Sequence, residues 1–108
     1  MSSKIFSPHG MEKAATEVAG VLRALANERR LVVLCKLVER GEANVNSLAE
    51  TVGLSQSALS QHLAKMREEG LVTYRRESQT LWYRIADPRI EDLLATLQKL
   101  YCNPLNPR

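Results

Sequence analysis

One stretch, residues 54–70, constrains the fold of this 108-residue chain more than any other. It predicts a single helix with a defined start and end. Ser55 suits the N-cap position, because its hydroxyl can accept a hydrogen bond from an unpaired amide of the first turn. Gly70 suits the left-handed residue that closes a helix. Apolar residues recur at helical spacing, so one face is expected to be buried. These residues are Leu59, Leu63 and Met66.

The opposite face of this helix is polar but carries little charge. Its residues are Ser57, Ser60, Gln61, Ala64 and Lys65. Gln can pair with the edge of adenine, and Ser can contact bases or phosphates. The N-terminus of a helix also attracts phosphate. The pattern therefore indicates a DNA recognition helix, and the alternative is an ordinary surface helix rich in Ser and Gln.

The segments on either side favour the DNA-binding interpretation. Asn44 is expected to cap a short helix over about 45–52, and Gly53 ends it, which gives two helices joined by a short turn. After residue 70 the pattern changes to the alternation of a hairpin, with strands at 71–76 and 80–85. A hairpin in this place is a wing. Its Arg75 and Arg76 would offer charge to the phosphate backbone, unless they are only a solvated basic pair.

Three further helices complete a mainly α, winged helix-turn-helix fold. They are predicted at about 11–26, at 28–40 after an Asn27 cap, and from Pro88 to about 102 after an Asp87 cap. We expect a flexible arm at 1–10, one domain at 11–102 and a loose tail at 103–108.

The first and last helices carry more apolar surface than a small winged core should cover. In the first helix the stripe is Ala14, Val18, Val21, Leu22 and Leu25; in the last it is Ile90, Leu93, Leu94, Leu97, Leu100 and Tyr101. A two-fold dimer would bury both stripes. It would also place two recognition helices about 34 Å apart and imply an inverted-repeat operator. The alternative is that the stripes pack within one protomer.

Composition adds three limits. The net charge of +3 permits an acidic partner without demanding one, and 44% apolar residues are typical of a globular chain. No apolar run is long enough to span a membrane, and the first ten residues lack the apolar segment of a signal peptide, so we expect a cytoplasmic protein. In that compartment two cysteines are more typical of redox chemistry, metal binding or burial than of a structural disulfide.

Three segments carry a family resemblance: Ala26-Asn27-Glu28-Arg29-Arg30-Leu31, the run from Gly53 to Leu63 that contains Ser-Gln-Ser-x-x-Ser-Gln-His-Leu, and Gly70-Leu71-Val72 followed by Arg75-Arg76-Glu77 and Tyr83. From about Met11 to Cys102 the chain resembles the ArsR/SmtB family of bacterial winged-helix repressors. The resemblance implies a homodimer that binds operator DNA and is released by an inducer. We expect no enzymatic activity and no cofactor.

The expected DNA-binding residues lie on the recognition helix and the wing. They are Ser55, Gln56, Ser57, Ser60, Gln61, His62, Lys65, Arg75 and Arg76. His62 matches the family's recognition-helix histidine, for which contact with DNA and packing of the helix both remain open.

Both of the family's metal sites are missing from the sequence. One uses Cys-x-Cys at the third helix, but residues 45–50 contain no cysteine. The other uses Asp and His along the last helix, but residues 87–102 contain no histidine. A closed zinc site needs four protein ligands, so we expect no bound metal.

Cys35 and Cys102 instead resemble the dithiol subgroup that senses persulfides and other reactive sulfur species. The resemblance implies that the two helices pack together and that oxidation links the thiols by a disulfide or a polysulfide bridge, which shifts the dimer. A related branch with the same cysteines activates virulence genes by displacing a silencer. A general oxidant or metal sensor, and two cysteines that are only buried, stay open. A thiol enzyme using Cys35 is disfavoured, because no partner histidine or Cys-x-x-Cys accompanies it.

Overall fold

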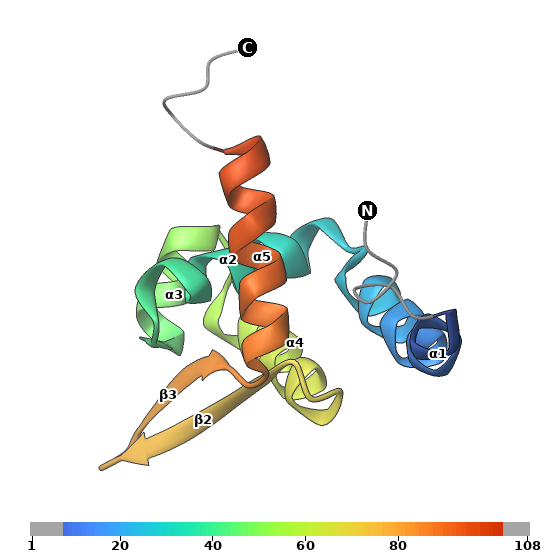
Figure 1. Ribbon diagram of the computed structural model, residues 1–108. Coiled ribbons are helices and arrows are strands. Elements are labelled where there is room, and N and C mark those ends of the chain that lie inside the picture. The colour runs from blue at the N-terminus through green and yellow to red at the C-terminus, as the bar shows by residue number, and fades with distance from the viewer. Residues whose placement is uncertain (1–7, 103–108) are drawn as a thin grey trace. The chain divides into compact units, whose positions relative to one another are not determined.

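The computed structural model describes residues 8–102, with five helices and a hairpin in the predicted order and one additional short strand (Figure 1). The elements are α1 (Pro8–Leu25), α2 (Glu28–Arg40), β1 (Ala43–Asn44), α3 (Val45–Val52), α4 (Gln56–Glu68), β2 (Val72–Glu77), β3 (Thr80–Ile85) and α5 (Pro88–Tyr101). The chain divides into two compact units at Leu31. The first holds α1 and the opening turn of α2, and the second holds everything that follows.

All four predicted N-caps are confirmed, because in each a backbone amide donates to the oxygen of the capping side chain. The pairs are Arg30 to Asn27 at 3.1 Å, Ser47 to Asn44 at 2.8 Å, Ala58 to Ser55 at 3.1 Å and Arg89 to Asp87 at 2.9 Å. The caps place the starts of α2, α3, α4 and α5 where the sequence predicts them.

Two glycines end the helices of the helix-turn-helix. Gly53 has φ +74°, and the amides of Gly53 and Leu54 donate to the carbonyl oxygen of Ala49 at 2.9 and 3.1 Å. Gly70 has φ +81°, and the next amide, that of Leu71, donates to the carbonyl oxygen of Met66. A left-handed residue here turns the chain sharply at little steric cost, so α4 follows α3 after only three residues.

The sheet contains a strand that the sequence pattern did not predict. β2 and β3 pair antiparallel with Tyr74 opposite Tyr83, as expected of the wing, and β1 adds to the other edge of β3. The order is therefore β1-β3-β2. β1 has only two residues, too few to display an alternating pattern. Its pairing with Trp82 and Tyr83 of β3 anchors the start of α3 against the wing.

The core of the second unit is built from the predicted apolar faces. Six residues of this core are fully buried: Leu34, Leu48, Leu59, Leu63, Met66 and Leu94. They come from α2, α3, α4 and α5, so four helices contribute to one core above the wing. This burial fixes which face of α4 is turned outward.

Two predicted elements have different bounds: the first wing strand spans Val72–Glu77 rather than 71–76, and α1 starts earlier than predicted. α1 begins at Pro8 rather than at Met11, so the last three residues of the predicted arm are helical. Proline is compatible with the first turn of a helix, since its fixed φ is helical and its missing amide would be unpaired there. The rest of the predicted arm and the tail at 103–108 lie outside the described residues. Within residues 8–102, no helix is long and apolar enough to cross a membrane.

Candidate nucleic-acid interface and cysteine pair

The outward face of α4 carries most of the predicted DNA-binding residues. Because Leu59, Leu63 and Met66 are fully buried, the polar side chains lie on the exposed side of the helix. The exposed residues are Ser55, Gln56, Ser57, Ser60, Gln61 and Lys65. His62 is half-buried at the edge of this face. The side chains of Gln61, His62 and Lys65 line a shallow hollow of about 250 Å³ together with Ala58.

The two wing arginines have different surroundings. The guanidinium of Arg75 forms a fork with the carboxylate of Glu42, with N–O distances of 2.7 and 3.1 Å, and also contacts Glu77 at 3.3 Å. It lies 5.8 Å from the ring centre of Trp82. The hydrogen bond from Arg75 lowers the pKa of the Glu42 carboxyl. Arg76 is exposed, and its side chain has no ion pair within the part of the chain that the structure describes.

Aromatic side chains connect the recognition helix to the wing. The guanidinium of Arg67, near the end of α4, lies 4.5 Å from the ring centre of Tyr74 on β2. The ring of Tyr74 packs against that of Tyr83 on β3, with centroids 5.3 Å apart. Burial, followed by the neighbouring Tyr74, raises the pKa of the Tyr83 hydroxyl. Sequence reasoning missed this connection, although two tyrosines on facing strands were a usable signal.

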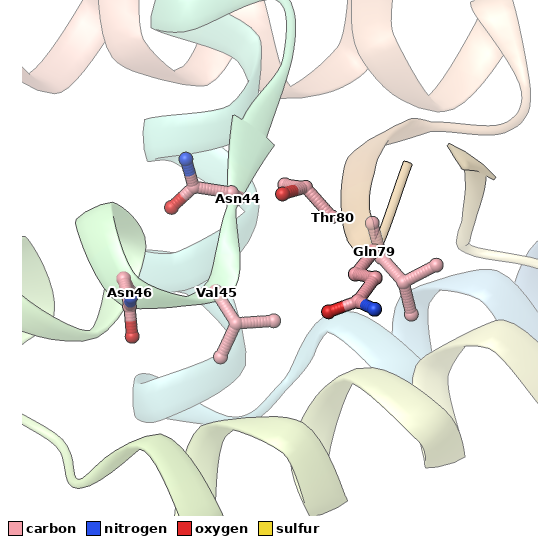
Figure 2. Close-up of a pocket in the computed structure, with 6 residues that line it drawn as sticks. Asn44, Val45, Asn46, Gln79 and Thr80 are labelled. Atoms are coloured by element: carbon pink, nitrogen blue, oxygen red, sulfur yellow. The ribbon is translucent and has the colours of Figure 1, made fainter. Parts of the chain in front are cut away.

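A polar hollow of about 300 Å³ lies between the start of α3 and the turn of the wing (Figure 2). Its lining residues are Asn44, Val45, Asn46, Gln79, Thr80 and Leu81. Figure 2 shows Asn44, Val45 and Asn46 on the α3 side of the hollow and Gln79 and Thr80 on the wing side. None of the lining side chains titrates near neutral pH, so the hollow offers amides and a hydroxyl but no acid, base or nucleophile suited to catalysis.

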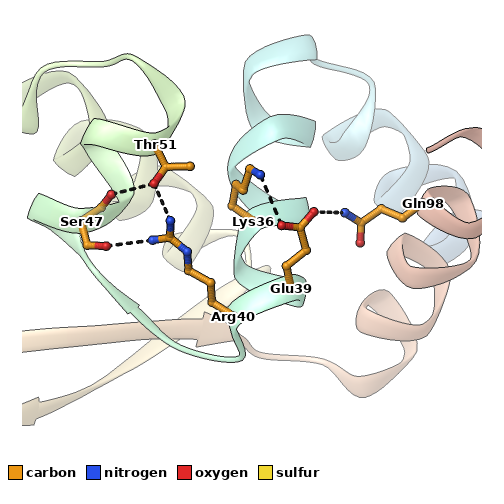
Figure 3. Close-up of polar contacts among 6 residues, drawn as sticks. All are labelled: Lys36, Glu39, Arg40, Ser47, Thr51 and Gln98. Carbon is orange, nitrogen blue, oxygen red and sulfur yellow. Dashed lines mark hydrogen bonds and ion pairs between the residues drawn. The ribbon is translucent and has the colours of Figure 1, made fainter. Parts of the chain in front are cut away.

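The end of α2 contacts three other elements through neighbouring side chains. Arg40 donates to the hydroxyls of Ser47 and Thr51 on α3 (Figure 3). Glu39 accepts from the side-chain amide of Gln98 on α5 at 2.8 Å. Glu42, just beyond the helix, holds Arg75 of β2. The segment from residue 39 to 42 therefore joins α5, the helix-turn-helix and the wing.

The two cysteines belong to α2 and to the end of α5, two of the elements that this segment joins. Cys35 is half-buried on α2, Cys102 is exposed just after α5, and both are free thiols. The pKa of Cys35 is raised, first by burial and then by the charges of Cys102 and Glu39, while Lys36 lowers it. The hydrogen bond between Glu39 and Gln98 lies about one helical turn from each cysteine. Among residues 8–102, no three His, Cys, Asp or Glu side chains are grouped so that they could hold a metal ion.

A helix-turn-helix followed directly by a two-stranded wing defines the class of winged helix-turn-helix DNA-binding proteins. Residues 27–74 match the profile described as bacterial regulatory protein, arsR family. The chain is 45% identical over 92 residues to the transcriptional activator HlyU of Vibrio cholerae, with 85% of this chain and 84% of the relative covered. It is 39% identical over 92 residues to the biofilm growth-associated repressor of Xylella fastidiosa, with 85% and 80% covered.

Solved structures agree with these sequence relatives. HlyU from Vibrio cholerae superimposes with a TM-score of 0.79 at 44% identity, over 86% of this chain and 100% of that one. The repressor BigR from Xylella fastidiosa gives a TM-score of 0.80 at 37% identity, over 90% and 98%. The chain belongs to the ArsR family of bacterial regulatory proteins. It is a transcriptional regulator and not an enzyme, from a family that binds operator DNA and is typically dimeric.

Proposed function

We propose that this regulator is a repressor that leaves its operator when reactive sulfur species bridge Cys35 and Cys102 within one subunit. The observation that carries the proposal is the hydrogen bond from Gln98 on α5 to Glu39 on α2 at 2.8 Å, because Cys102 and Cys35 each lie four residues, or about one helical turn, from it. A dithiol across two helices is suited to a bridge, because closing it changes how those helices pack.

On the DNA side, the proposal assigns base reading to Gln56, Ser57, Ser60 and Gln61, with Ser55, His62 and Lys65 beside them. Arg75 and Arg76 of the wing are assigned to the phosphate backbone. The exposure of most of these side chains supports the assignment. Two copies joined through α1 and α5 would present two such faces to an inverted repeat, one in each of two successive major grooves.

The proposed chemistry balances with an organic persulfide, RSSH, as the oxidant. One cysteine thiolate attacks the outer sulfur, the RS–S bond breaks, and RS⁻ leaves and takes up a proton. The second thiolate then attacks the first cysteine's own sulfur and expels HS⁻, so two thiols and one RSSH give a disulfide, RSH and H₂S. If both cysteines are loaded first, two RSSH give a trisulfide bridge, two RSH and one H₂S.

The contacts at the end of α2 supply a route from the bridge to the DNA-binding elements. Closing the bridge pulls on α2 one turn before Glu39, and the adjoining Arg40 and Glu42 hold α3 and β2. A shift of α2 would therefore move the helix-turn-helix and the wing together. We infer that the reduced and bridged forms are two discrete packings with different affinities for DNA.

The test is fluorescence anisotropy with the DNA upstream of the protein's own gene. Reduced protein, protein treated with a disulfide oxidant and protein treated with an organic persulfide are compared, each with intact-mass analysis. We expect persulfide to release wild-type protein with a bridge between the cysteines. Cys35→Ser and Cys102→Ser should bind DNA like reduced wild type and ignore persulfide. A persulfide response in either variant equal to that of wild type would exclude the dithiol mechanism.

A second candidate is that the same dithiol controls an activator. The relative in Vibrio cholerae is named a transcriptional activator, while the Xylella relative is named a repressor. Transcription from the bound promoter in vitro, with reduced protein, separates the two directions: a repressor lowers the transcript level and an activator raises it. Equilibrium dialysis with zinc and copper(I), followed by operator titration, tests a metal inducer in the same samples.

A further inference from the structure

The carboxylate of Glu39 sits between the two cysteine-bearing helices. One oxygen accepts from the side-chain amide of Gln98 on α5 at 2.8 Å, and the other pairs with Lys36 on α2 at 3.3 Å (Figure 3). The Glu39–Gln98 contact is a direct side-chain hydrogen bond between α2 and α5. It joins residues 59 positions apart, so only the folded packing brings them together.

Helix geometry relates this contact to the thiols. Cys35 precedes Glu39 by four residues, and Cys102 follows Gln98 by four residues. Residues four apart lie on the same face of a helix, one turn from each other. The amide of Cys102 also donates to the carbonyl oxygen of Gln98 at 2.7 Å, which ties Cys102 to the last turn of α5. The hydrogen bond and the two cysteines therefore lie on adjacent turns of α2 and α5.

Charge gives Glu39 a second influence on the pair. The titratable groups that act on Cys35 are Cys102, Glu39 and Lys36, and Glu39 disfavours the thiolate while Lys36 favours it. Since the thiolate is the nucleophile in exchange with a persulfide or a disulfide, the carboxylate limits the reactive fraction at neutral pH.

We propose that Glu39 is a positioning residue for the bridging reaction. Its hydrogen bond to Gln98 holds α2 against α5 at the separation from which the bridge closes, and its charge restrains the thiols until an inducer arrives. This role rests on the proposed dithiol function. In this role Glu39 does not contact the inducer, but it determines how fast, and at which pH, the bridge forms.

Two variants separate the contact from the charge. Glu39→Gln keeps an oxygen that can accept from Gln98 and removes the charge. Gln98→Ala removes the contact and keeps the charge. Glu91→Gln removes one exposed carboxylate elsewhere on α5 and serves as the matched control. Far-UV circular dichroism and thermal unfolding of each reduced protein establish that the variants fold.

The rate of bridge formation is followed by acid quench, alkylation and intact mass between pH 6 and pH 9, with an organic persulfide and separately with diamide. We expect Gln98→Ala to slow closure by about tenfold, within the range that a small misplacement of reacting groups costs. For Gln98→Ala, the pH at which the rate of bridge formation is half-maximal should match that of wild type. For Glu39→Gln we expect the midpoint to move to lower pH with the maximal rate kept, and for Glu91→Gln we expect neither change.

The outcomes distinguish this inference from the function on which it rests. Wild-type protein that bridges with diamide but not with persulfide would overturn the sulfur inducer and still test Glu39 through the diamide rates. Wild-type protein that forms no bridge with either reagent would overturn both. If wild type bridges and the rates and midpoints of Glu39→Gln and Gln98→Ala superimpose on it, Glu39 has no positioning role.

Discussion

At the scale of single residues, adjacent positions on the wing differ in how much charge they can offer to DNA. Arg75 is held by Glu42 and Glu77, so two carboxylates already oppose its charge. The next residue, Arg76, projects from the opposite face of the strand and is exposed. Among the two, Arg76 is therefore the one whose charge is more available to a phosphate.

We expect Arg76→Ala to weaken binding to all DNA sequences alike and to reduce the slope of log affinity against log salt by about one, because one phosphate contact is lost. Gln61→Ala should instead relax the sequence preference and leave the salt slope unchanged. Anisotropy titrations at several salt concentrations, with operator and with unrelated DNA, measure both effects. A loss confined to the operator in Arg76→Ala would reverse the two assignments.

The residue scale also marks a limit of sequence reasoning. Each cap was predictable, because the capping side chain lies only two or three positions from the backbone amide whose hydrogen bond it accepts. The partner of Arg75 was not, because Glu42 lies 33 positions away and only the fold brings it near. The contact between Glu39 and Gln98 was not predicted for the same reason, since these residues are 59 positions apart.

At the scale of elements, the turn between α3 and α4 sets the direction of the recognition helix. Gly53 adopts φ +74° there, and a Cβ added to it would meet no atom within 4 Å. Substitution would therefore cost conformational energy alone, without a clash.

We expect Gly53→Ala to lower the free energy of unfolding by about 1 to 2 kcal/mol, the cost of a left-handed conformation for a residue with a Cβ. Gly53→Asn should lose less, because asparagine tolerates this region better. Urea denaturation at a fixed protein concentration measures both. Equal losses in the two variants would mean that backbone conformation is not the cause.

Helices in which apolar residues repeat at helical spacing were predictable, whereas the two-residue strand β1 and the start of α1 were not. α2, α3 and α4 repeat apolar residues at helical spacing over at least two turns, so their bounds followed from the sequence. β1 has two residues and exists because it pairs with β3. The start of α1 at Pro8 lies in a segment of Ser, Pro, His and Gly that has no apolar period.

At the scale of the whole molecule, apolar side chains remain on the surface of α1 and α5. The exposed fractions are 57% for Met11, 53% for Leu22, 61% for Leu100 and 72% for Tyr101. All four are large, and two of them are the residues immediately before Cys102. A second copy of the chain would cover them, as the proposed dimer requires.

We expect Tyr101→Glu combined with Leu22→Glu to shift the reduced protein from dimer to monomer in sedimentation velocity and to abolish tight binding to the inverted repeat. Charges placed in an apolar interface cannot be paired there, so association becomes unfavourable. Ala95→Glu adds a charge to another exposed face of α5 and should leave the dimer intact. A double variant that stays dimeric would place the interface elsewhere.

The wing carries the only tryptophan of the sequence, Trp82, half-buried on β3 opposite Arg75. Light absorbed selectively by indole therefore excites one site, and the intrinsic emission of the unlabelled protein comes from the wing alone. Indole emission responds to nearby charge and to water, and the guanidinium of Arg75 lies over this ring. The protein thus contains its own optical probe at the element that should contact the DNA backbone. The wavelength of this emission can be followed while the thiols react in another part of the same unit.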